Sequence, residues 1–353
     1  CPYVPPHEFN IDFPHLILRY RYAEKIKKSG LSIINKIILN TDLTGKIGSY
    51  FAPLINWSLS KKNIIIKKII QSFTDIHKSA RLPKFNFRSF SQMNKKIIHK
   101  KQNLFGNRKV VVYTTCYVNY NLPNVAVAAL KVLNKNNVSV EFIYPECCGM
   151  PKLEAGDLQA VTDKAKRISG KLVPWIDKGY KILTLTPSCG LMLKSEWKLL
   201  DPENKNIIKV ADATKDICEY IVEISKEFDF IRGTKNIEKN ISLHIACHTK
   251  AQNIGIKSAE MLKSVPDIKI NLIDKCSGHG GSFGVRRDTY QLAKKYGKMA
   301  ARKIPNSDDT IIASECPLAA QHLSELNAEI NNKKTSLETY HPIEILAESY
   351  VDE

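Results

Sequence analysis

The cysteines are the residues of this sequence whose type and spacing could do the most chemistry. There are nine in 353 residues, and seven fall at or just beyond the ends of expected strands. An odd number of thiols, in a chain for which we expect no secretion signal, argues against a disulfide framework and favours thiolate ligation of a metal centre. The seven are Cys116, Cys147, Cys148, Cys189, Cys247, Cys276 and Cys316.

These seven cysteines form an internal repeat. The steps are 31 and 42 positions in the first half, from Cys116 to Cys147 and on to Cys189, and 29 and 40 positions in the second half. Matched cysteines of the two halves are therefore 131, 129 and 127 positions apart. Self-similarity at a nearly fixed distance indicates a duplicated structural unit.

Strands and helices alternate from residue 109 onward, which predicts βαβ units and parallel sheets. The expected strands are 109–115, 138–144 and 180–186, then 242–246, 268–273 and 310–313. The expected helices are 125–133, 154–178 and 211–228, then 251–263, 287–303 and 318–326. The predicted fold class is α/β, with two tandem pseudo-repeated parallel sheets.

The position of the cysteines after the strands predicts a metal site. Ligands of open α/β sheets lie beyond the carboxyl ends of the strands, where loops that are far apart in sequence meet. A set of thiolates suits zinc or an iron–sulfur cluster. The chain lacks the closely spaced cysteine pairs of structural zinc sites, and adjacent Cys147 and Cys148 suit an extended cluster better than one tetrahedral ion. We therefore favour an iron–sulfur cluster.

The N-terminal third carries most of the positive charge. Residues 1–105 hold 19 basic and 5 acidic side chains, which is +14 of the total net charge of +18. We expect little periodic structure in residues 1–30. Two or three short amphipathic helices should follow, separated near Gly45, Gly48 and Pro53, with a linker at 81–88.

This basic segment has three candidate uses. It could lie on an anionic membrane surface, where each Lys or Arg contributes about 1 kcal/mol, or it could dock on an acidic partner subunit. Nucleic-acid binding ranks last because no recognition motif accompanies the charge. A solvated linker is the plain alternative. No apolar run approaches the ~20 residues that a membrane-spanning helix needs.

The cysteine pattern resembles the CCG (cysteine-rich) domain, which is duplicated in one of the subunits of heterodisulfide reductase. The same domain occurs in the iron–sulfur subunits of glycolate oxidase and of anaerobic glycerol-3-phosphate dehydrogenase. The family pattern is Cys, about thirty residues, Cys-Cys-Gly, a further stretch and Cys-x-x-Cys, and the resemblance covers 109–350. The N-terminal third is similar to the iron–sulfur subunit of the glycerol-3-phosphate enzyme at 1–7, 13–16, 41–46 and 82–85.

The resemblance also implies a domain order. In such proteins a two-cluster ferredoxin module precedes this region, and Cys1-Pro2 looks like the last step of its cluster-binding run. Cys1 would then be a metal ligand orphaned by missing upstream cysteines. The expected domains are a ferredoxin remnant at 1–30, a basic amphipathic helical linker at 31–105, and CCG domains at 106–232 and 238–353.

The sequence departs from the family pattern at three positions. Met192 and Ala319 stand where the last cysteine of each half would fall, and Ser277 replaces one cysteine of the second pair. The first half keeps four thiolates (Cys116, Cys147, Cys148 and Cys189), enough for one cluster. The second keeps Cys247, Cys276 and Cys316, to which His248 or His279 could add an imidazole. The resemblance implies a [4Fe–4S] cluster, of noncubane type where all five cysteines are present.

These observations predict an iron–sulfur electron-transfer subunit. A partner flavoprotein dehydrogenase of glycerol-3-phosphate or 2-hydroxy-acid type, which alone would carry FAD, would pass electrons through the clusters towards quinone. We find no catalytic nucleophile, triad or nucleotide loop. One alternative is a disulfide (heterodisulfide) reductase subunit with the cluster as its catalytic site; another is a non-redox membrane-anchoring scaffold. We expect a cytoplasmic location, with peripheral contact of residues 31–80 with the inner membrane.

Overall fold

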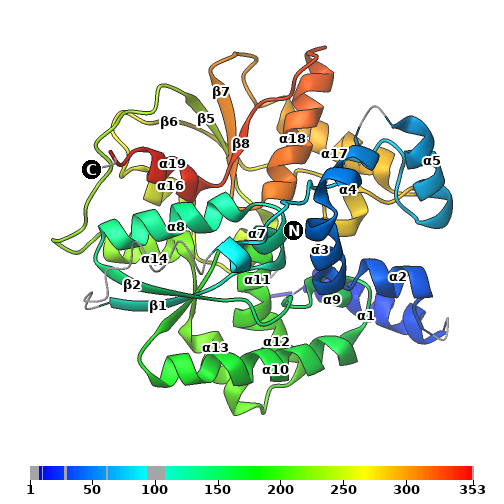
Figure 1. Cartoon of the computed structure of the whole chain (residues 1–353), viewed down its shortest axis with the longest axis horizontal. Coiled ribbons are helices and arrows are strands. Elements are labelled where there is room, and N and C mark those ends of the chain that lie inside the picture. The colour runs from blue at the N-terminus through cyan, green and yellow to red at the C-terminus, as the bar shows by residue number, and fades with distance from the viewer. Residues whose placement is uncertain (1–7, 10, 28–29, 61–62, 94–107, 352–353) are drawn as a thin grey trace.

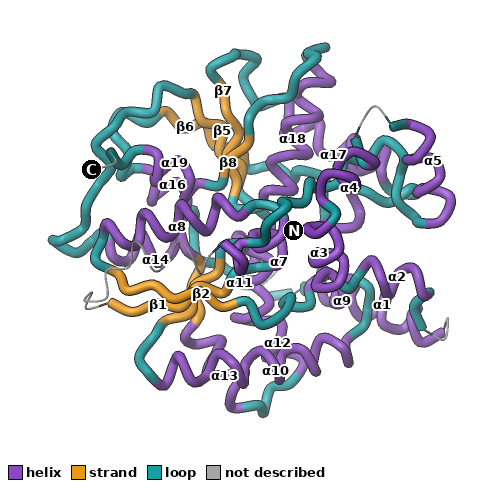
Figure 2. The backbone as a smooth tube through the Cα atoms, viewed as in Figure 1, coloured by secondary structure: helices purple, strands orange, loops and turns teal. Residues whose placement is uncertain are grey.

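The structure is a computed structural model, and it describes residues 8–9, 11–27, 30–60, 63–93 and 108–351. Two four-stranded parallel sheets dominate it, as the alternating pattern predicts (Figure 2). The first sheet has the order β2-β1-β3-β4 and the second the order β6-β5-β7-β8, so the two have the same topology. The strands are β1 (Arg108–Tyr113), β2 (Val138–Ile143), β3 (Lys181–Thr184), β4 (Thr214–Asp216), β5 (Asn240–His244), β6 (Lys269–Ile273), β7 (Thr310–Ser314) and β8 (Thr339–Tyr340).

Helices connect the strands of each repeat. The first repeat contains α7 (Cys116–Tyr120), α8 (Pro123–Lys135), α9 (Met150–Glu154), α10 (Leu158–Asp177), α11 (Pro187–Leu191), the π-helical turn η1 (Met192–Glu196), α12 (Trp197–Leu200), α13 (Lys205–Ala213) and α14 (Ile217–Ile224). The second contains α15 (Cys247–Ala251), α16 (Lys257–Leu262), the 3₁₀ turn η2 (Gly281–Gly284), α17 (Tyr290–Ala301), α18 (Pro317–Ile330) and α19 (Pro342–Glu348). The buried apolar runs of β1 and β7 are typical of strands covered on both faces.

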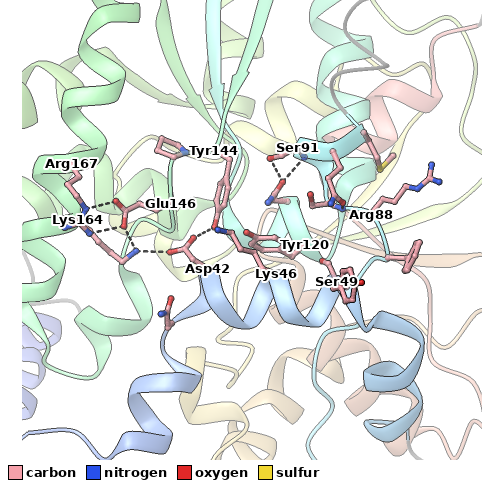
Figure 3. Close-up of a pocket in the computed structure, with 18 of the residues that line it drawn as sticks. Asp42, Lys46, Ser49, Arg88, Ser91, Tyr120, Tyr144, Glu146, Lys164 and Arg167 are labelled. Atoms are coloured by element: carbon pink, nitrogen blue, oxygen red, sulfur yellow. Dashed lines mark hydrogen bonds and ion pairs between the residues drawn. The ribbon is translucent and has the colours of Figure 1, made fainter.

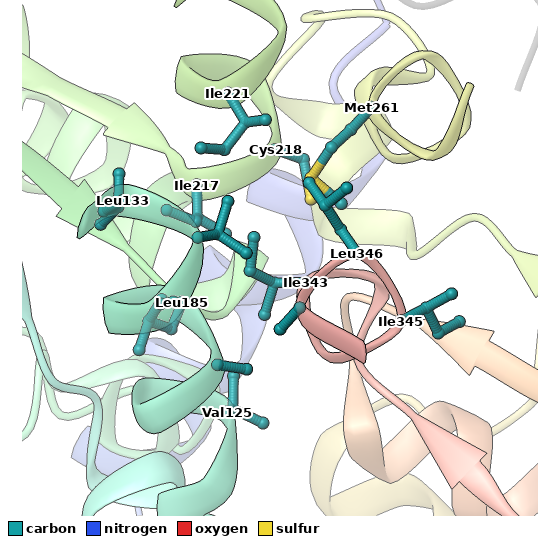
Figure 4. Packing of buried hydrophobic residues seen from close by; sticks show 14 of the residues in the cluster. Val125, Leu133, Leu185, Ile217, Cys218, Ile221, Met261, Ile343, Ile345 and Leu346 are labelled. Atoms are coloured by element: carbon teal, nitrogen blue, oxygen red, sulfur yellow. The ribbon is translucent and has the colours of Figure 1, made fainter. Parts of the chain in front are cut away.

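The two repeats share one hydrophobic core. Helix α8 packs on α19 of the other repeat, and α14 packs on α16, so the helix after the first strand of each repeat meets the helix after the last strand of the other. Figure 4 shows the apolar side chains between them, including Leu133, Ile217, Met261, Ile343 and Leu346. Burying one such side chain completely stabilises the folded state by about 1.5–3 kcal/mol. This shared core fixes the orientation of one repeat against the other.

Helices of the described part of the N-terminal segment lie along one side of both repeats (Figure 1). They are α1 (Phe13–Lys27), α2 (Ile33–Ile38), α3 (Thr41–Tyr50), α4 (Ala52–Ser58) and α5 (Ile64–Phe73). Helix α1 contacts α9, and α3 contacts α7. Further along, Ile76 bridges to Arg286, and the ring of His77 stacks on Tyr290 with 4.2 Å between centroids. The segment thus contacts both repeats.

Several sequence expectations for this segment are wrong. Residues 13–27 form a regular helix, where we expected little periodicity, because α1 is anchored by polar contacts such as Arg21 to the Glu154 carbonyl (3.0 Å). Gly45 and Gly48 do not separate helices but lie inside α3. They are needed there because a Cβ at either position would collide with the ring of Tyr120 or of Phe85. The structure confirms a loop at 81–88.

The repeats also correct the expected elements. The helix expected at 154–178 is α10, which begins only at Leu158. Gly156 separates it from α9, because its φ of +75° breaks the helix and its missing Cβ leaves room for the backbone of Arg21. The helix expected at 211–228 is interrupted by the short strand β4. Helices α13 and α19 and the strand β8 are additional. No helix in the described part of the chain is long and apolar enough to span a membrane.

Candidate metal centre

Four thiols gather at the carboxyl edge of the first sheet. Cys116 opens α7 after β1, Cys147 and Cys148 lie in the loop after β2, and Cys189 lies in α11 after β3. Because β2, β1 and β3 are adjacent and parallel, their carboxyl ends open on one crevice. Three of the four cysteines are buried and Cys116 is half-buried.

The four thiols form a continuous chain of contacts. The Sγ atoms of Cys148 and Cys189 lie 3.3 Å apart. Cys147 makes side-chain hydrogen bonds with Cys116 on one side and Cys148 on the other. These hydrogen bonds lower the pKa of Cys147 well below its ordinary value, while the hydrogen bond with Cys147 and burial raise the pKa of Cys116. The pKa of Cys148 is raised as well, so Cys147 ionises more readily than Cys116 or Cys148.

The immediate surroundings hold this loop in place. The indole N–H of Trp197 donates to the Cys148 carbonyl oxygen at 3.1 Å, and the Tyr113 hydroxyl donates to the Glu146 carbonyl oxygen at 2.5 Å. Gly149 follows the cysteine pair with a φ of +96°, which permits the sharp turn into α9. Met192, at the place of the family's last cysteine, is fully buried at the start of η1.

The N-terminal segment contributes two residues that sequence reasoning missed. The Asp42 carboxylate accepts the Cys147 backbone N–H at 2.9 Å and the Tyr144 hydroxyl at 2.6 Å. The Thr41 hydroxyl interacts with the thiols of Cys116 and Cys147. In the sequence, the stretch 41–46 shows only a similarity to relatives, because nothing in its local pattern indicates that Asp42 contacts a residue 105 positions away.

A charged network surrounds Asp42. Lys164 lies between two carboxylates, with its Nζ 2.9 Å from Asp42 and 2.7 Å from Glu146. Arg167 is also paired with Glu146 at 2.9 Å. The hydrogen bonds from Arg167 and Lys164 outweigh partial burial and lower the pKa of Glu146. The acidic groups near the thiols are thus neutralised by cations of α10.

The second repeat presents an equivalent but more open set of thiols. Cys247 opens α15 after β5, Cys276 follows β6, and Cys316 precedes α18 after β7. Cys247 and Cys276 are exposed and share a hydrogen bond, while Cys316 is half-buried. That hydrogen bond, helped by the Gly278 N–H at 3.3 Å, lowers the pKa of Cys276 to about 6.

The two candidate histidines lie in different surroundings. His279 is buried, with its ring centroid 5.7 Å from that of His322, and burial lowers its pKa to about 4. His248 is half-buried in α15, and desolvation lowers its pKa. Both imidazoles are therefore neutral near pH 7, which is the form that binds metals. Ser277 is buried beside Cys276, and its hydroxyl accepts the His279 N–H at 3.4 Å.

The two thiol sets lie across the repeat boundary from each other. Helix α11, which carries Cys189, packs on α15, which carries Cys247. Gln252 links the two loops, because its side-chain amide donates to the Pro187 carbonyl oxygen at 3.0 Å. On the other side, Tyr117 lies near enough to Cys316 for an electrostatic interaction. Neither Gln252 nor Tyr117 carries a sequence signal for this role.

The donor chemistry fits an iron–sulfur group better than a single ion. No group of three or more His, Cys, Asp or Glu side chains within the described ranges is arranged to hold one metal ion. The first site nevertheless offers four neighbouring, largely buried sulfur atoms, which is the ligand type of iron–sulfur clusters. Cys218 lies apart from both sets, in the shared core. Cys1 lies outside the described residues.

Comparisons with known proteins agree with this chemistry. Residues 110–194, which include all four thiols of the first site, match the cysteine-rich domain family CCG. One of the subunits of anaerobic glycerol-3-phosphate dehydrogenase from Escherichia coli K12 is 24% identical over 327 residues, which is 90% of this chain and 77% of that protein. An iron–sulfur protein of Methanocaldococcus jannaschii is 30% identical over 222 residues, 62% of this chain and 41% of that protein.

A further relative belongs to a reductase. One of the subunits of the dihydromethanophenazine:CoB–CoM heterodisulfide reductase of Methanosarcina barkeri is 27% identical over 229 residues, 61% of this chain and 53% of that protein. These relatives include an iron–sulfur protein and subunits of a dehydrogenase and a reductase. Together with the converging thiols, they lead to one conclusion: residues 110–194 are similar to the CCG cysteine-rich domain family.

Proposed function

We propose that this chain is an iron–sulfur electron-transfer subunit of an oxidoreductase complex. The proposed ligands of its principal cluster are the four thiols of the first site, Cys116, Cys147, Cys148 and Cys189. The observation that carries the proposal is the gathering of these thiols from three separate strand ends into one buried group. Such a cluster, of proposed [4Fe–4S] type, supplies electron transfer when bound, and its potential depends on ligands, hydrogen bonds and burial.

The protein's own part is to hold and tune the group. Trp197 and Asp42 fix the backbone of the cysteine pair through hydrogen bonds to Cys148 and Cys147. Helix α3 packs on α7, the helix that begins at Cys116. These contacts would exclude water and keep the sulfur positions constant between oxidation states.

The experiment is iron and acid-labile sulfide analysis of the anaerobically purified chain. We expect the wild type to contain iron and sulfide in equal amounts, and the double variant Cys147→Ser/Cys148→Ser to lose the first cluster. Cys218→Ala is the matched control, because Cys218 lies in the shared core away from both thiol sets. Iron content that is unchanged in the double variant would reject the ligand assignment.

The second set is proposed as a further cluster site. Its ligands would be Cys247, Cys276 and Cys316, with His248 or His279 as a fourth. The position of this set across α11 and α15 from the first supports electron exchange between the two. Cys1 is proposed as a ligand of a ferredoxin-type cluster.

The proposal includes a partner subunit and a route for the electrons. A dehydrogenase subunit carrying FAD, acting on glycerol-3-phosphate or a 2-hydroxy acid, would deliver electrons, and quinone would receive them. Similarity over 90% of the chain to a glycerol-3-phosphate dehydrogenase subunit supports this assignment. We also propose that the protein acts on the cytoplasmic side of the inner membrane. Co-purification of a flavoprotein with the tagged chain would test the partner.

A disulfide reductase is the second candidate. The observation that favours it is the exposure of Cys247 and Cys276, since a substrate sulfur could approach these thiols from solvent. Similarity to a heterodisulfide reductase subunit agrees with it. A disulfide that changes the paramagnetic-resonance spectrum of the reduced protein would favour this candidate over simple electron transfer.

Peripheral membrane contact through residues 31–80 completes the proposal. Exposed apolar side chains on α5 support it, with Ile65 76% exposed and Phe73 69% exposed. Lys68 lies on the same helix. An apolar face with neighbouring lysines is the composition that binds anionic lipid surfaces.

A further inference from the structure

A large pocket lies beside the first site, between the N-terminal segment and the first repeat. It has a volume of about 1430 Å³, beyond the usual range of 300–1,000 Å³ for small-molecule pockets. Figure 3 shows Asp42, Tyr120 and Tyr144 on its wall. Asp42 also accepts the Cys147 backbone N–H, so the pocket lies next to the thiol group.

The lining of the pocket has an excess of positive charge. Five lining residues are basic, namely Lys46, Arg88, Lys152, Lys164 and Arg167, and two are acidic, namely Asp42 and Glu146. The two acids are already paired with Lys164 and Arg167. For Lys46 and Arg88, no acidic partner is seen in the part of the chain that the structure describes, and both are exposed. The pocket therefore attracts anions.

A buried hydroxyl in the lining lacks a partner. Ser49 is 5% exposed, and its Oγ makes no hydrogen bond to the described residues. A buried hydroxyl without a partner is unfavourable, because the hydrogen bond that it loses with water is not replaced. Ser49 lies one helical turn after Lys46 on α3, so the two side chains belong to the same face of the helix. An anionic ligand in the pocket could therefore accept a hydrogen bond from the Ser49 hydroxyl and form an ion pair with Lys46.

Aromatic rings supply the other part of the lining. Tyr50 and Phe87 are exposed at the pocket, while Tyr120 and Tyr144 pack edge to face with ring centroids 5.7 Å apart. Rings of this kind offer stacking surfaces to a planar group. Among the residues that the structure describes, the pocket thus combines cations without an acidic partner, a hydroxyl without a hydrogen bond and aromatic surface.

We propose that this pocket binds a phosphorylated compound with a planar ring, its phosphate held by Lys46, Arg88 and Ser49 and its ring by the aromatic lining. The proposal goes beyond the electron-transfer role and does not need a cluster for binding. Guanidinium and ammonium groups are the usual partners of phosphate in proteins, and the arginine can bind two of its oxygens.

Titration calorimetry of the full-length, anaerobically purified chain tests this assignment. The probes are flavin mononucleotide, which has both parts, pyrophosphate, which has the anion, and riboflavin, which has the ring. We expect flavin mononucleotide to bind at least tenfold more tightly than riboflavin, with an affinity that falls as salt is raised. Pyrophosphate should bind more weakly than the mononucleotide and compete with it.

Single variants localise the binding. Lys46→Ala and Arg88→Ala should each weaken flavin mononucleotide binding about tenfold or more, as expected for loss of a charged hydrogen bond. Ser49→Ala should weaken it several-fold. Lys334→Ala is the matched control, because this exposed lysine lies in the second repeat and away from the pocket. Iron content and circular dichroism of each variant show that the protein remains folded.

Three results would overturn the proposal. These are no binding of flavin mononucleotide or pyrophosphate up to about 1 mM, equal affinity for riboflavin and the mononucleotide, or wild-type affinity in both the Lys46 and Arg88 variants. Iron analysis of the same samples separates this outcome from failure of the electron-transfer role. If the protein contains iron but does not bind the ligand, only the pocket proposal is rejected. If it binds the ligand but contains no iron, only the cluster proposal is rejected.

Discussion

The carboxylate of Asp42 accepts the backbone N–H of Cys147 at 2.9 Å, and 105 positions of sequence separate the two residues. This hydrogen bond joins a helix of the N-terminal segment to the cysteine pair of the first repeat. Asp42 also faces Lys164 and Tyr144, so its charge is partly compensated. The N-terminal segment is therefore part of the first site.

The first prediction concerns this carboxylate. Replacing Asp42 by Asn keeps an acceptor for Cys147 and removes a negative charge near the proposed cluster. Because reduction adds negative charge, we expect the reduction potential to rise by roughly 60 mV, a tenfold change in the one-electron equilibrium. A redox titration followed by paramagnetic resonance measures this shift. Asp212→Asn, on an exposed side chain of α13, is the control. An unchanged potential in a fully loaded Asp42→Asn protein would contradict the tuning role.

The second prediction concerns the second thiol set. Cys276→Ser should lower the iron content by the share of one cluster, since Cys276 is one of three thiols in that set. The resonance signal of the first site should persist, because its chain of thiol contacts runs through Cys147 and does not include Cys276. An iron content equal to that of the wild type would remove Cys276 from the proposed ligands.

The third prediction concerns a buried acid near the repeat boundary. Burial, together with the neighbouring charge of Glu315, raises the pKa of Asp216 to about 7. In the unfolded chain the Asp216 carboxyl has its ordinary pKa of 3.8. Between about pH 4 and pH 7 this carboxyl is therefore ionised in the unfolded state but still largely protonated in the folded state, so the free energy of unfolding falls as the pH rises. Lys194 and Glu219 also face this carboxyl. Its partial neutrality near pH 7 is the physical basis of the test.

Asp216→Asn removes this titration and keeps an oxygen for the Cys218 N–H, which Asp216 accepts at 2.8 Å. Relative to the wild type, the variant should gain about 2–3 kcal/mol of unfolding free energy between pH 5 and pH 8. Urea unfolding at several pH values measures the difference, and Asp212→Asn again serves as a control. A difference that does not change with pH would show that Asp216 ionises normally in the folded protein.

The fourth prediction concerns the apolar side of α5. Ile65→Glu combined with Ile69→Glu should weaken binding to vesicles that contain anionic lipid at least tenfold, because each exposed isoleucine would bury its side chain in the lipid interface. Sedimentation with vesicles measures the bound fraction. The comparison variant is Leu199→Glu, an exposed leucine of the first repeat. Equal binding of both variants and the wild type would exclude α5 as the contact.

The sequence by itself determined the α/β class, the duplication and the convergence of the thiols. Buried β-branched runs such as 110–112 favour central strands, and cysteines placed after adjacent parallel strands meet at one edge of the sheet. These conclusions depend on local periodicity and on spacing, which a single sequence displays. The short strands β4 and β8 could not be predicted from the sequence, because two or three residues are too few to show an alternation of apolar and polar side chains.

Tertiary structure alone decided what surrounds the site. Gly45 reads as a break in a helix, yet it lies within α3 because the ring of Tyr120 occupies the space of a Cβ. In the sequence, Asp42 is a single acidic residue in a basic stretch. Its contact with Cys147 exists only because α3 packs on α7. The pocket beside the first site likewise depends on packing, which brings Lys46 and Arg88 from separate segments to one cavity. Such contacts join residues through packing between distant segments, and no local pattern encodes them.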